Sequence, residues 1–108
     1  MKRGRIGDAP SPGQGESFVE LVSARGVTIE EIVSSADTPA ATYEQDHDEW
    51  VMLVEGSATL TVGDVSVAPV DVVALRAGDW LWIPAGVRHT VEEVGEGTRW
   101  LAVHLPPG

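Results

Sequence analysis

The chain has 108 residues, of which 43% are hydrophobic, no cysteine, and a formal net charge of -10. This length suits one domain, and the absence of cysteine excludes disulfide frameworks, thiolate nucleophiles and cysteine-held zinc or iron–sulfur sites. An acidic surface repels nucleic acids and acidic membranes, and no apolar run approaches the length of a membrane span. We therefore expect a soluble cytoplasmic protein that binds no nucleic acid and no membrane, but a cation, a small molecule or another protein.

Residues 1–17 differ in composition from the rest of the chain. They are rich in Gly, Pro and Ser and carry three basic and two acidic side chains, a net of +1, whereas residues 18–108 carry -11. A segment with so little apolar surface to bury is typical of a flexible tail. We expect such a tail over residues 1–17 and one folded domain over residues 18–108.

Short β-rich runs separated by turn signals fill the remaining chain. Residues 18–22 fit either a strand or one helical turn, and the alternation over residues 27–33 favours a strand. Gly56 with Ser57, and Gly63 with Asp64, predict hairpin turns. Further β-rich runs cover residues 50–55, 58–62, 65–67, 70–75, 80–83, 90–94 and 100–105. Eight or more short strands without helical periodicity predict an all-β barrel or sandwich.

Several of these strands are apolar on both faces. In the run at residues 50–55, Val51 and Leu53 share one face, while Trp50, Met52 and Val54 share the other. A small closed barrel has one dry interior, so the second face must meet a second sheet, a loop or another subunit. We expect a homodimer on this argument, and sandwich packing is the alternative.

The stretch from Gly78 to His89 carries the most specific pattern. A predicted strand rises from the turn at Gly78, ends at Pro84, turns again through Gly86 and presents His89 as the next strand begins. Glycine gives the backbone its freedom and proline ends the ladder of hydrogen bonds. His89 is therefore either an imidazole held on a rigid rim or a polar residue that starts a strand.

This stretch resembles the second signature motif of the cupin superfamily. That motif runs Gly, five residues, Pro-x-Gly, two residues and His, and this sequence matches all of those positions. Its usual terminal Asn is replaced here by Glu93. The resemblance implies a cupin-type jelly-roll β-barrel, similar to small single-domain cupins of undefined activity.

The first cupin motif matches only in part. It consists of a His-x-His pair, a Glu, six residues and a Gly, and Glu49 and Gly56 have the last spacing. The two histidine positions fall on Tyr43 and Gln45, so both imidazoles are replaced. The resemblance is thus strong in the second motif and degraded in the first.

The resemblance implies a site for a divalent transition metal (Fe, Mn, Ni or Zn) held by three imidazoles and one carboxylate. Glu49 and His89 match as ligands, and Gln45 and Tyr43 offer an amide oxygen and a phenol, which bind such metals more weakly than imidazole does. His47 stands two residues before Glu49 and on a continuous strand would face the same way, which completes a two-histidine, one-carboxylate set. The alternative places His47 in a solvated turn among acidic residues.

Four further roles are predicted. Glu49 and His89 could act as an acid–base pair without a metal, and Tyr43 as an acid, a base or a substrate contact. Trp82 lies within the second motif and is predicted to line the pocket. His104, in the last strand, either contributes to the pocket wall or makes a structural hydrogen bond.

These residues support three hypotheses of function. The favoured one is a metal-capable cupin that acts on an organic small molecule as an oxygenase, isomerase, cyclase or lyase. The second is a non-catalytic barrel that binds a small ligand or a metal. The third is a structural dimerisation module.

Overall fold

The structure is a computed structural model, and it describes residues 1–107. Within these residues the structure has nine strands and no helix. The described residues therefore contain no helix that could span a membrane. The strands are β1 (Glu16–Ala24), β2 (Val27–Ser34), β3 (Ala41–Tyr43), β4 (Glu49–Glu55), β5 (Ser57–Val62), β6 (Asp71–Arg76), β7 (Trp80–Ile83), β8 (His89–Val94) and β9 (Thr98–His104).

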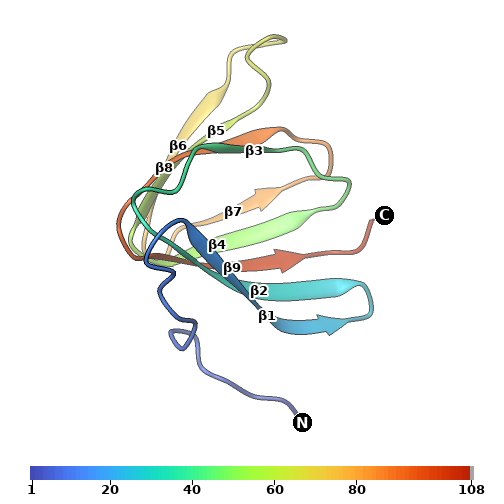
Figure 1. Ribbon diagram of the computed structural model, residues 1–108. Coiled ribbons are helices and arrows are strands. Elements are labelled where there is room, and N and C mark those ends of the chain that lie inside the picture. The colour runs from blue at the N-terminus through green and yellow to red at the C-terminus, as the bar shows by residue number, and fades with distance from the viewer. Residues whose placement is uncertain (108) are drawn as a thin grey trace.

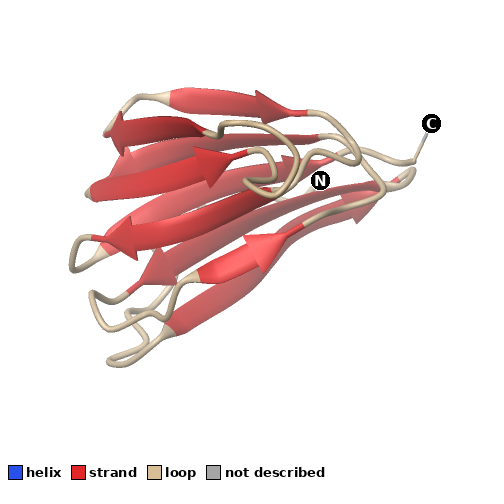
Figure 2. Ribbon diagram, turned by 90° about the horizontal axis from the view of Figure 1, so that it is seen from above, coloured by secondary structure: helices blue, strands red, loops and turns tan. Residues whose placement is uncertain are grey.

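The strands form two antiparallel sheets that face each other (Figure 1). One sheet has five strands in the order β1-β2-β9-β4-β7, and the other has four in the order β3-β8-β5-β6. Figure 2 shows the same arrangement from above, with loops joining the strands at both ends. The chain is therefore a single-domain all-β jelly roll, as the sequence predicts.

The core lies between the sheets because the strands alternate buried and exposed residues. Val51 and Leu53 point inward from β4, and Ala58 and Leu60 point inward from β5. The other buried members of this cluster are Leu75, Ile83, Trp100 and Ala102.

The link between β4 and β5 differs from the prediction. Gly56 and Ser57 do not close a hairpin, because β4 pairs with β7 and β9, whereas β5 pairs with β6 and β8. Gly56 has a φ of 96° and carries the chain from one sheet to the other. A Cβ atom at Gly56 would lie 2.7 Å from the Cα atom of Thr98, so the corner admits only glycine without a shift of the backbone.

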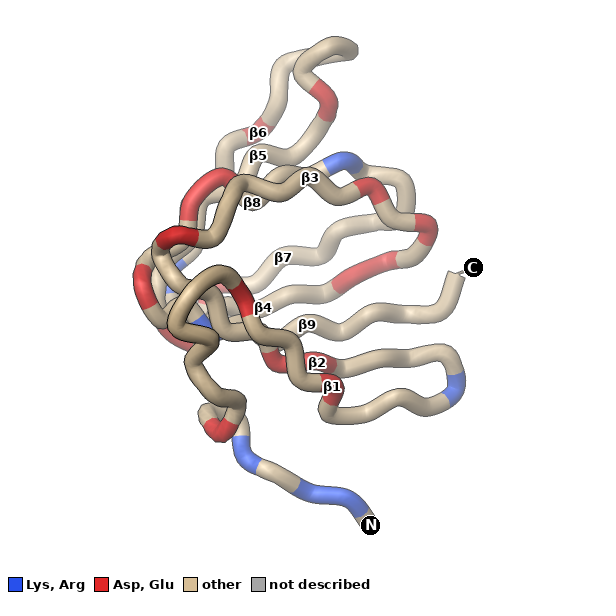
Figure 3. Tube along the Cα trace, viewed as in Figure 1, with Lys and Arg blue, Asp and Glu red and all other residues tan. Residues whose placement is uncertain are grey.

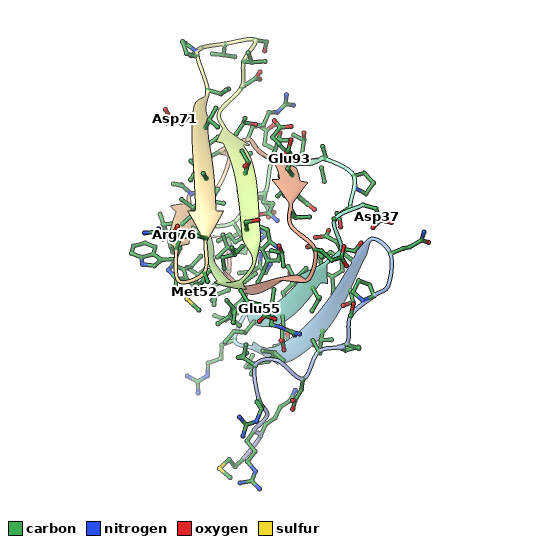
Figure 4. The ribbon with its side chains drawn as sticks, turned by 90° about the vertical axis from the view of Figure 1, so that its left-hand side faces the viewer. Asp37, Met52, Glu55, Asp71, Arg76 and Glu93 are labelled. Atoms are coloured by element: carbon green, nitrogen blue, oxygen red, sulfur yellow. The ribbon has the colours of Figure 1, made fainter. Side chains whose placement is uncertain are left out.

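Smaller differences concern the strand boundaries. Residues 18–22 belong to strand β1 and not to a helical turn, and β1 begins at Glu16, two residues before the expected start of the domain. Residues 65–67 lie in the turn that precedes β6, whose ends are marked by Asp71 and Arg76 in Figure 4. The short strand β3 lies between the predicted runs at residues 27–33 and 50–55, where no strand is expected from the sequence.

Part of the predicted tail packs against the five-stranded sheet. The Gly7 N–H donates to Glu31 Oε2 at 2.8 Å, and Arg99 donates to the Ala9 carbonyl at 3.1 Å and to Glu31 Oε2 at 2.5 Å. Glu31 is only 1% exposed, so these residues cover a buried ion pair. The basic residues before Gly7 extend beyond this contact, while acidic residues are spread over the rest of the chain (Figure 3).

The outer face of β4 and β7 is apolar. Trp50 stands opposite Trp82 in the ladder and Met52 stands opposite Trp80, and the rings of Trp50 and Trp80 lie 6.3 Å apart. Trp80 is 59% exposed and Trp82 is 48% exposed. Neither the second sheet nor the described N-terminal residues bury these two tryptophans.

Candidate functional site

A cavity of about 100 Å³ lies between the two sheets and opens to solvent. Its polar lining comprises three carboxylates (Glu16, Glu30 and Glu49), two imidazoles (His89 and His104), Tyr43 and Gln45. Its apolar lining includes Ile32, Val51, Leu60, Ile83, Val91 and Trp100. The cavity therefore contains both residues that match the cupin motifs and both residues that replace the motif histidines.

Glu49 occupies the centre of this polar group. It is the first residue of β4, where it pairs with His104 of β9 and Ile83 of β7, and its side chain is 11% exposed. Glu49 Oε1 lies 3.7 Å from His89 Nε2, and Glu49 Oε2 lies 3.8 Å from His104 Nε2. Burial raises the pKa of Glu49, although the two imidazoles oppose that rise.

His89 presents one particular nitrogen to the cavity. Its ring is 4% exposed, and Nδ1 lies 3.0 Å from the Val87 carbonyl oxygen, which can only accept a hydrogen bond. Nδ1 therefore carries the hydrogen, and in the neutral ring Nε2 has the free lone pair that faces Glu49. At 3.7 Å that nitrogen makes no hydrogen bond with Glu49.

The loop before β4 fixes the turn that carries His89. The Gly86 N–H donates to the Gln45 carbonyl at 2.7 Å, and the Ala85 N–H donates to Asp48 Oδ1 at 2.8 Å. Two backbone donors of the second motif are thus satisfied by residues of the first motif. The two motifs are held together by their loops as well as by the barrel.

Tyr43 and Gln45 lie in the cavity wall at the two histidine positions of the family. The Tyr43 ring stacks on the His89 ring with centroids 5.6 Å apart, and the two residues are partners in the β3–β8 ladder. Burial raises the pKa of Tyr43, and the carboxylates of Glu16, Glu49 and Glu30 raise it further. The Tyr43 hydroxyl therefore stays protonated at neutral pH and is available as a hydrogen-bond donor.

His104 and His47 belong to a chain of polar contacts. His104 Nε2 lies 3.0 Å from Glu30 Oε1, and His104 Nδ1 lies 2.9 Å from His47 Nε2. His47 Nδ1 lies 3.1 Å from Asp46 Oδ1. Three hydrogen bonds need three ring hydrogens, and two neutral imidazoles have two, so the complete chain carries one imidazolium. The hydrogen bond with Glu30 raises the pKa of His104, in agreement with that count.

The structure places the predicted site residues in two groups. Tyr43, Gln45, Glu49, His89 and His104 line one cavity. His47 is in the loop before β4, outside the cavity lining. Its ring contacts His104 and does not join Glu49 in the cavity.

The prediction for Trp82 is wrong. Trp82 is half-exposed on the outer face of β7, whereas Trp100 of β9 lines the cavity and donates its Nε1–H to Ser34 Oγ at 3.1 Å. Sequence reasoning also missed the cavity carboxylates Glu16 and Glu30. The sequence held a signal for Glu30, because Glu30 shares a strand face with the apolar Ile32, which also lines the cavity. Glu16 had no such signal, because it stands within the expected tail.

The donor set does not fit the family's centre of three imidazoles and one carboxylate. Two of its four positions hold Tyr43 and Gln45, which leaves Glu49 and His89. Within residues 1–107, no group of three or more His, Asp or Glu side chains is arranged to hold a metal ion. A catalytic zinc has three protein ligands as a rule, and two matched donors fall short of that number.

Comparisons with known proteins agree with this fold. A solved structure from Ralstonia eutropha JMP134, described as a candidate mannose-6-phosphate isomerase, is 38% identical, with a TM-score of 0.81 and coverage of 98% of this chain and 99% of the other. An uncharacterized Streptomyces coelicolor protein, SCO3923, is 25% identical over 91 residues, which are 84% of this chain and 81% of that protein. A structure of Fe(II) HppE is 17% identical, with a TM-score of 0.71, and covers 84% of this chain and 50% of the other.

Comparison of the sequence with known families also identifies the cupin fold. The family described as the cupin domain matches residues 29–104, which run from β2 to the end of β9 and include every polar residue of the cavity except Glu16. The chain belongs to the cupin family.

Proposed function

We propose that the cavity binds a small organic molecule and that Glu49 exchanges a proton with it. The position of Glu49 carries this proposal: the carboxyl is buried, both of its oxygens face imidazole nitrogens without a hydrogen bond, and burial raises its pKa. A carboxyl whose pKa moves toward neutrality is better suited to general acid–base catalysis than an exposed one.

The neighbours of Glu49 have distinct roles in this scheme. His89 offers Nε2 as a second acceptor 3.7 Å from Glu49, held in place by the Val87 carbonyl. Tyr43 offers a protonated hydroxyl, because burial raises its pKa. Acceptors and a donor therefore line the same cavity, as a proton transfer between two positions of one ligand requires.

The chain through His104 connects this site to solvent. It runs from Glu30 in the cavity through His104 and His47 to Asp46, whose side chain is 86% exposed. Protons can pass along contacts of 2.9 to 3.1 Å between such groups. The chain ends on Glu30 and would exchange protons with that cavity carboxylate, while Glu49, 3.8 Å from His104 Nε2, would exchange its proton with the ligand.

The relative described as a candidate mannose-6-phosphate isomerase supports the reaction class and not that substrate. Isomerisation of a sugar is a proton-transfer reaction, which Glu49 and its neighbours suit. A phosphate needs a cationic partner, and no lysine or arginine stands among the described residues that line the cavity.

Metal binding is the second candidate function. Glu49 and His89 favour it because Glu49 Oε1 and His89 Nε2, which could both bind a metal ion, face each other in the cavity. Fe(II) and Co(II) forms of HppE share the fold. With Glu49 and His89 as ligands, a divalent Fe, Mn, Ni or Zn ion would still need a third ligand, either the amide oxygen of Gln45 in the cavity wall or His47, which would have to move inward.

The experiment combines metal analysis with ligand screening of untagged protein. We expect substoichiometric metal, and ligands whose addition shifts the amide resonances of Tyr43, Glu49 and His89 even after treatment with a chelator. Glu49→Gln should weaken binding, while Glu93→Gln, which removes the same charge from an exposed position of β8, should not.

Two outcomes would overturn the proposal. Stoichiometric metal that is lost in His89→Ala, with ligand binding that requires it, would establish the metal candidate instead. If no compound of any charge shifts the cavity resonances, the barrel is a structural module and not a small-molecule site.

A further inference from the structure

The charge of the cavity restricts what it can hold. Its lining contains the carboxylates of Glu16, Glu30 and Glu49, while no Lys or Arg lies among the lining residues within the described chain. The cationic charge available there is that of the imidazoles, and His104 already donates to Glu30 at 3.0 Å. Glu16 is also engaged, because it accepts from Ser34 Oγ at 2.5 Å.

Glu49 and His89 differ from these engaged groups. Within residues 1–107, neither oxygen of Glu49 has a hydrogen-bond donor within range, and neither does Nε2 of His89, although the His89 side chain is 96% buried. Every fully enclosed side-chain nitrogen or oxygen of the described chain has a partner. The free atoms of Glu49 and His89 are therefore acceptors that a ligand in the cavity can reach.

We propose that the ligand of this cavity is a small alkylammonium, whose N–H groups donate to Glu49 and to His89 Nε2. This inference rests on the proposed function and names the class of molecule that the site binds. An ammonium supplies both the positive charge that the carboxylates require and several donors for the three free acceptor atoms. Apolar and aromatic residues, among them Val51, Leu60 and Trp100, would contact its alkyl chain.

The size of the cavity limits the ligand. A cavity of about 150 Å³ holds one benzene molecule, so the volume of about 100 Å³ found here suits about four or five non-hydrogen atoms. The part of the ligand that enters is therefore no larger than a butylammonium ion. The cavity cannot enclose a whole phosphorylated hexose, and the phosphate would find no Lys or Arg among the lining residues of the described chain.

The test uses four probes of matched size at physiological ionic strength: n-butylammonium, 1-butanol, butyrate and tetramethylammonium. Each is titrated into isotopically labelled full-length protein, and binding is read from the amide resonances of Glu49, Ile83 and His89. We expect n-butylammonium to bind at least tenfold more tightly than 1-butanol or butyrate. Tetramethylammonium has the charge without the N–H donors and should bind at least several-fold more weakly than n-butylammonium.

Two variants separate the cavity from the acidic surface. Glu49→Gln should reduce n-butylammonium affinity at least tenfold, while Glu93→Gln, the charge-matched exposed control, should leave it unchanged. Equal losses in both variants would show that the ammonium binds the surface charge and would overturn the inference.

The remaining outcomes separate the two proposals. Tighter binding of 1-butanol or butyrate than of n-butylammonium would overturn the alkylammonium assignment and leave the small-molecule site in place. Equal binding of tetramethylammonium and n-butylammonium would overturn the assigned N–H contacts. Absence of binding by all four probes, together with a negative ligand screen, would overturn both proposals.

Discussion

At the scale of single residues, Glu49 and His104 both hold a proton more tightly in the folded protein than in the unfolded chain. Burial raises the pKa of Glu49, and the hydrogen bond with Glu30 raises the pKa of His104. A raised pKa contributes stability that is complete below the unfolded value and is lost as pH rises through the folded value. The reference pKa values are 4.5 for Glu49 and 6.5 for His104. Both contributions to stability therefore become smaller as the pH increases from mildly acidic values.

We therefore predict that the free energy of unfolding falls as pH rises above 4.5, through the Glu49 contribution, and falls further above 6.5, through the His104 contribution. Glu49→Gln should flatten the lower part of this decline and His104→Gln the upper part. Urea unfolding of each protein across the pH range measures the effect. Glu93→Gln controls for the self-repulsion of a chain with a net charge of -10. A wild-type stability that increases between pH 6 and 9 would contradict the sign.

The sequence located part of this site and missed part of it for a physical reason. The turn around Gly86 and the register of β8 place His89 in the cavity, as the resemblance to the second cupin motif implies, whereas its spacing alone left the role of His89 open. Trp82 and Trp100 could not be told apart, because both stand in strands that are apolar on both faces. Alternation shows which residues share a face, and only the packing of the sheets shows which face is inside.

At the scale of elements, the turn residues predicted the ends of the strands correctly. They were a poorer guide to which strands pair with each other. Gly78 and Gly86 lie in turns at the expected ends of strands, whereas Gly56 with Ser57 marks a corner between the sheets. A hairpin and a corner both need a glycine with a positive φ, so the local sequence is the same for either. The pairing is decided by contacts with β7, β8 and β9, which are distant along the chain.

The corner at Gly56 yields a prediction with an internal control. Gly56→Ala should cost about 2–5 kcal/mol, because a left-handed conformation costs about 1–2 kcal/mol for alanine and crowding against the Thr98 backbone adds about 1–3 kcal/mol. Gly78 has a similar φ of 93°, and a Cβ atom added there would meet nothing within 4 Å, so Gly78→Ala should cost only about 1–2 kcal/mol. Chemical denaturation of both variants measures the difference. Equal losses would mean that Thr98 yields without strain and that the corner is not a tight one.

At the scale of the whole molecule, the exposed tryptophans of β7 leave an apolar surface to be explained. We propose that the outer face of β4 and β7 is where two copies of the chain associate. β7 is an edge strand of its sheet, so both its face and its edge are available to a second copy.

The oligomeric state tests this proposal by light scattering at micromolar concentration. We expect twice the chain mass of 11.5 kDa for the wild type and the mass of a single chain for Trp82→Lys. Val72→Lys is the matched control, because Val72 is 69% exposed on β6 of the other sheet and should leave the dimer intact. A wild-type protein with the mass of one chain would refute the homodimer.

The two halves of the site come from different sheets, with Glu49 and His104 on one and Tyr43 and His89 on the other. A molecule bound between them would contact both sheets of the jelly roll at once. Its binding would then slow hydrogen exchange on both sheets at once, far beyond the amides that it touches. A mutation anywhere in the protein that lets the two sheets separate more often would therefore weaken ligand binding, even though no residue of the site is changed.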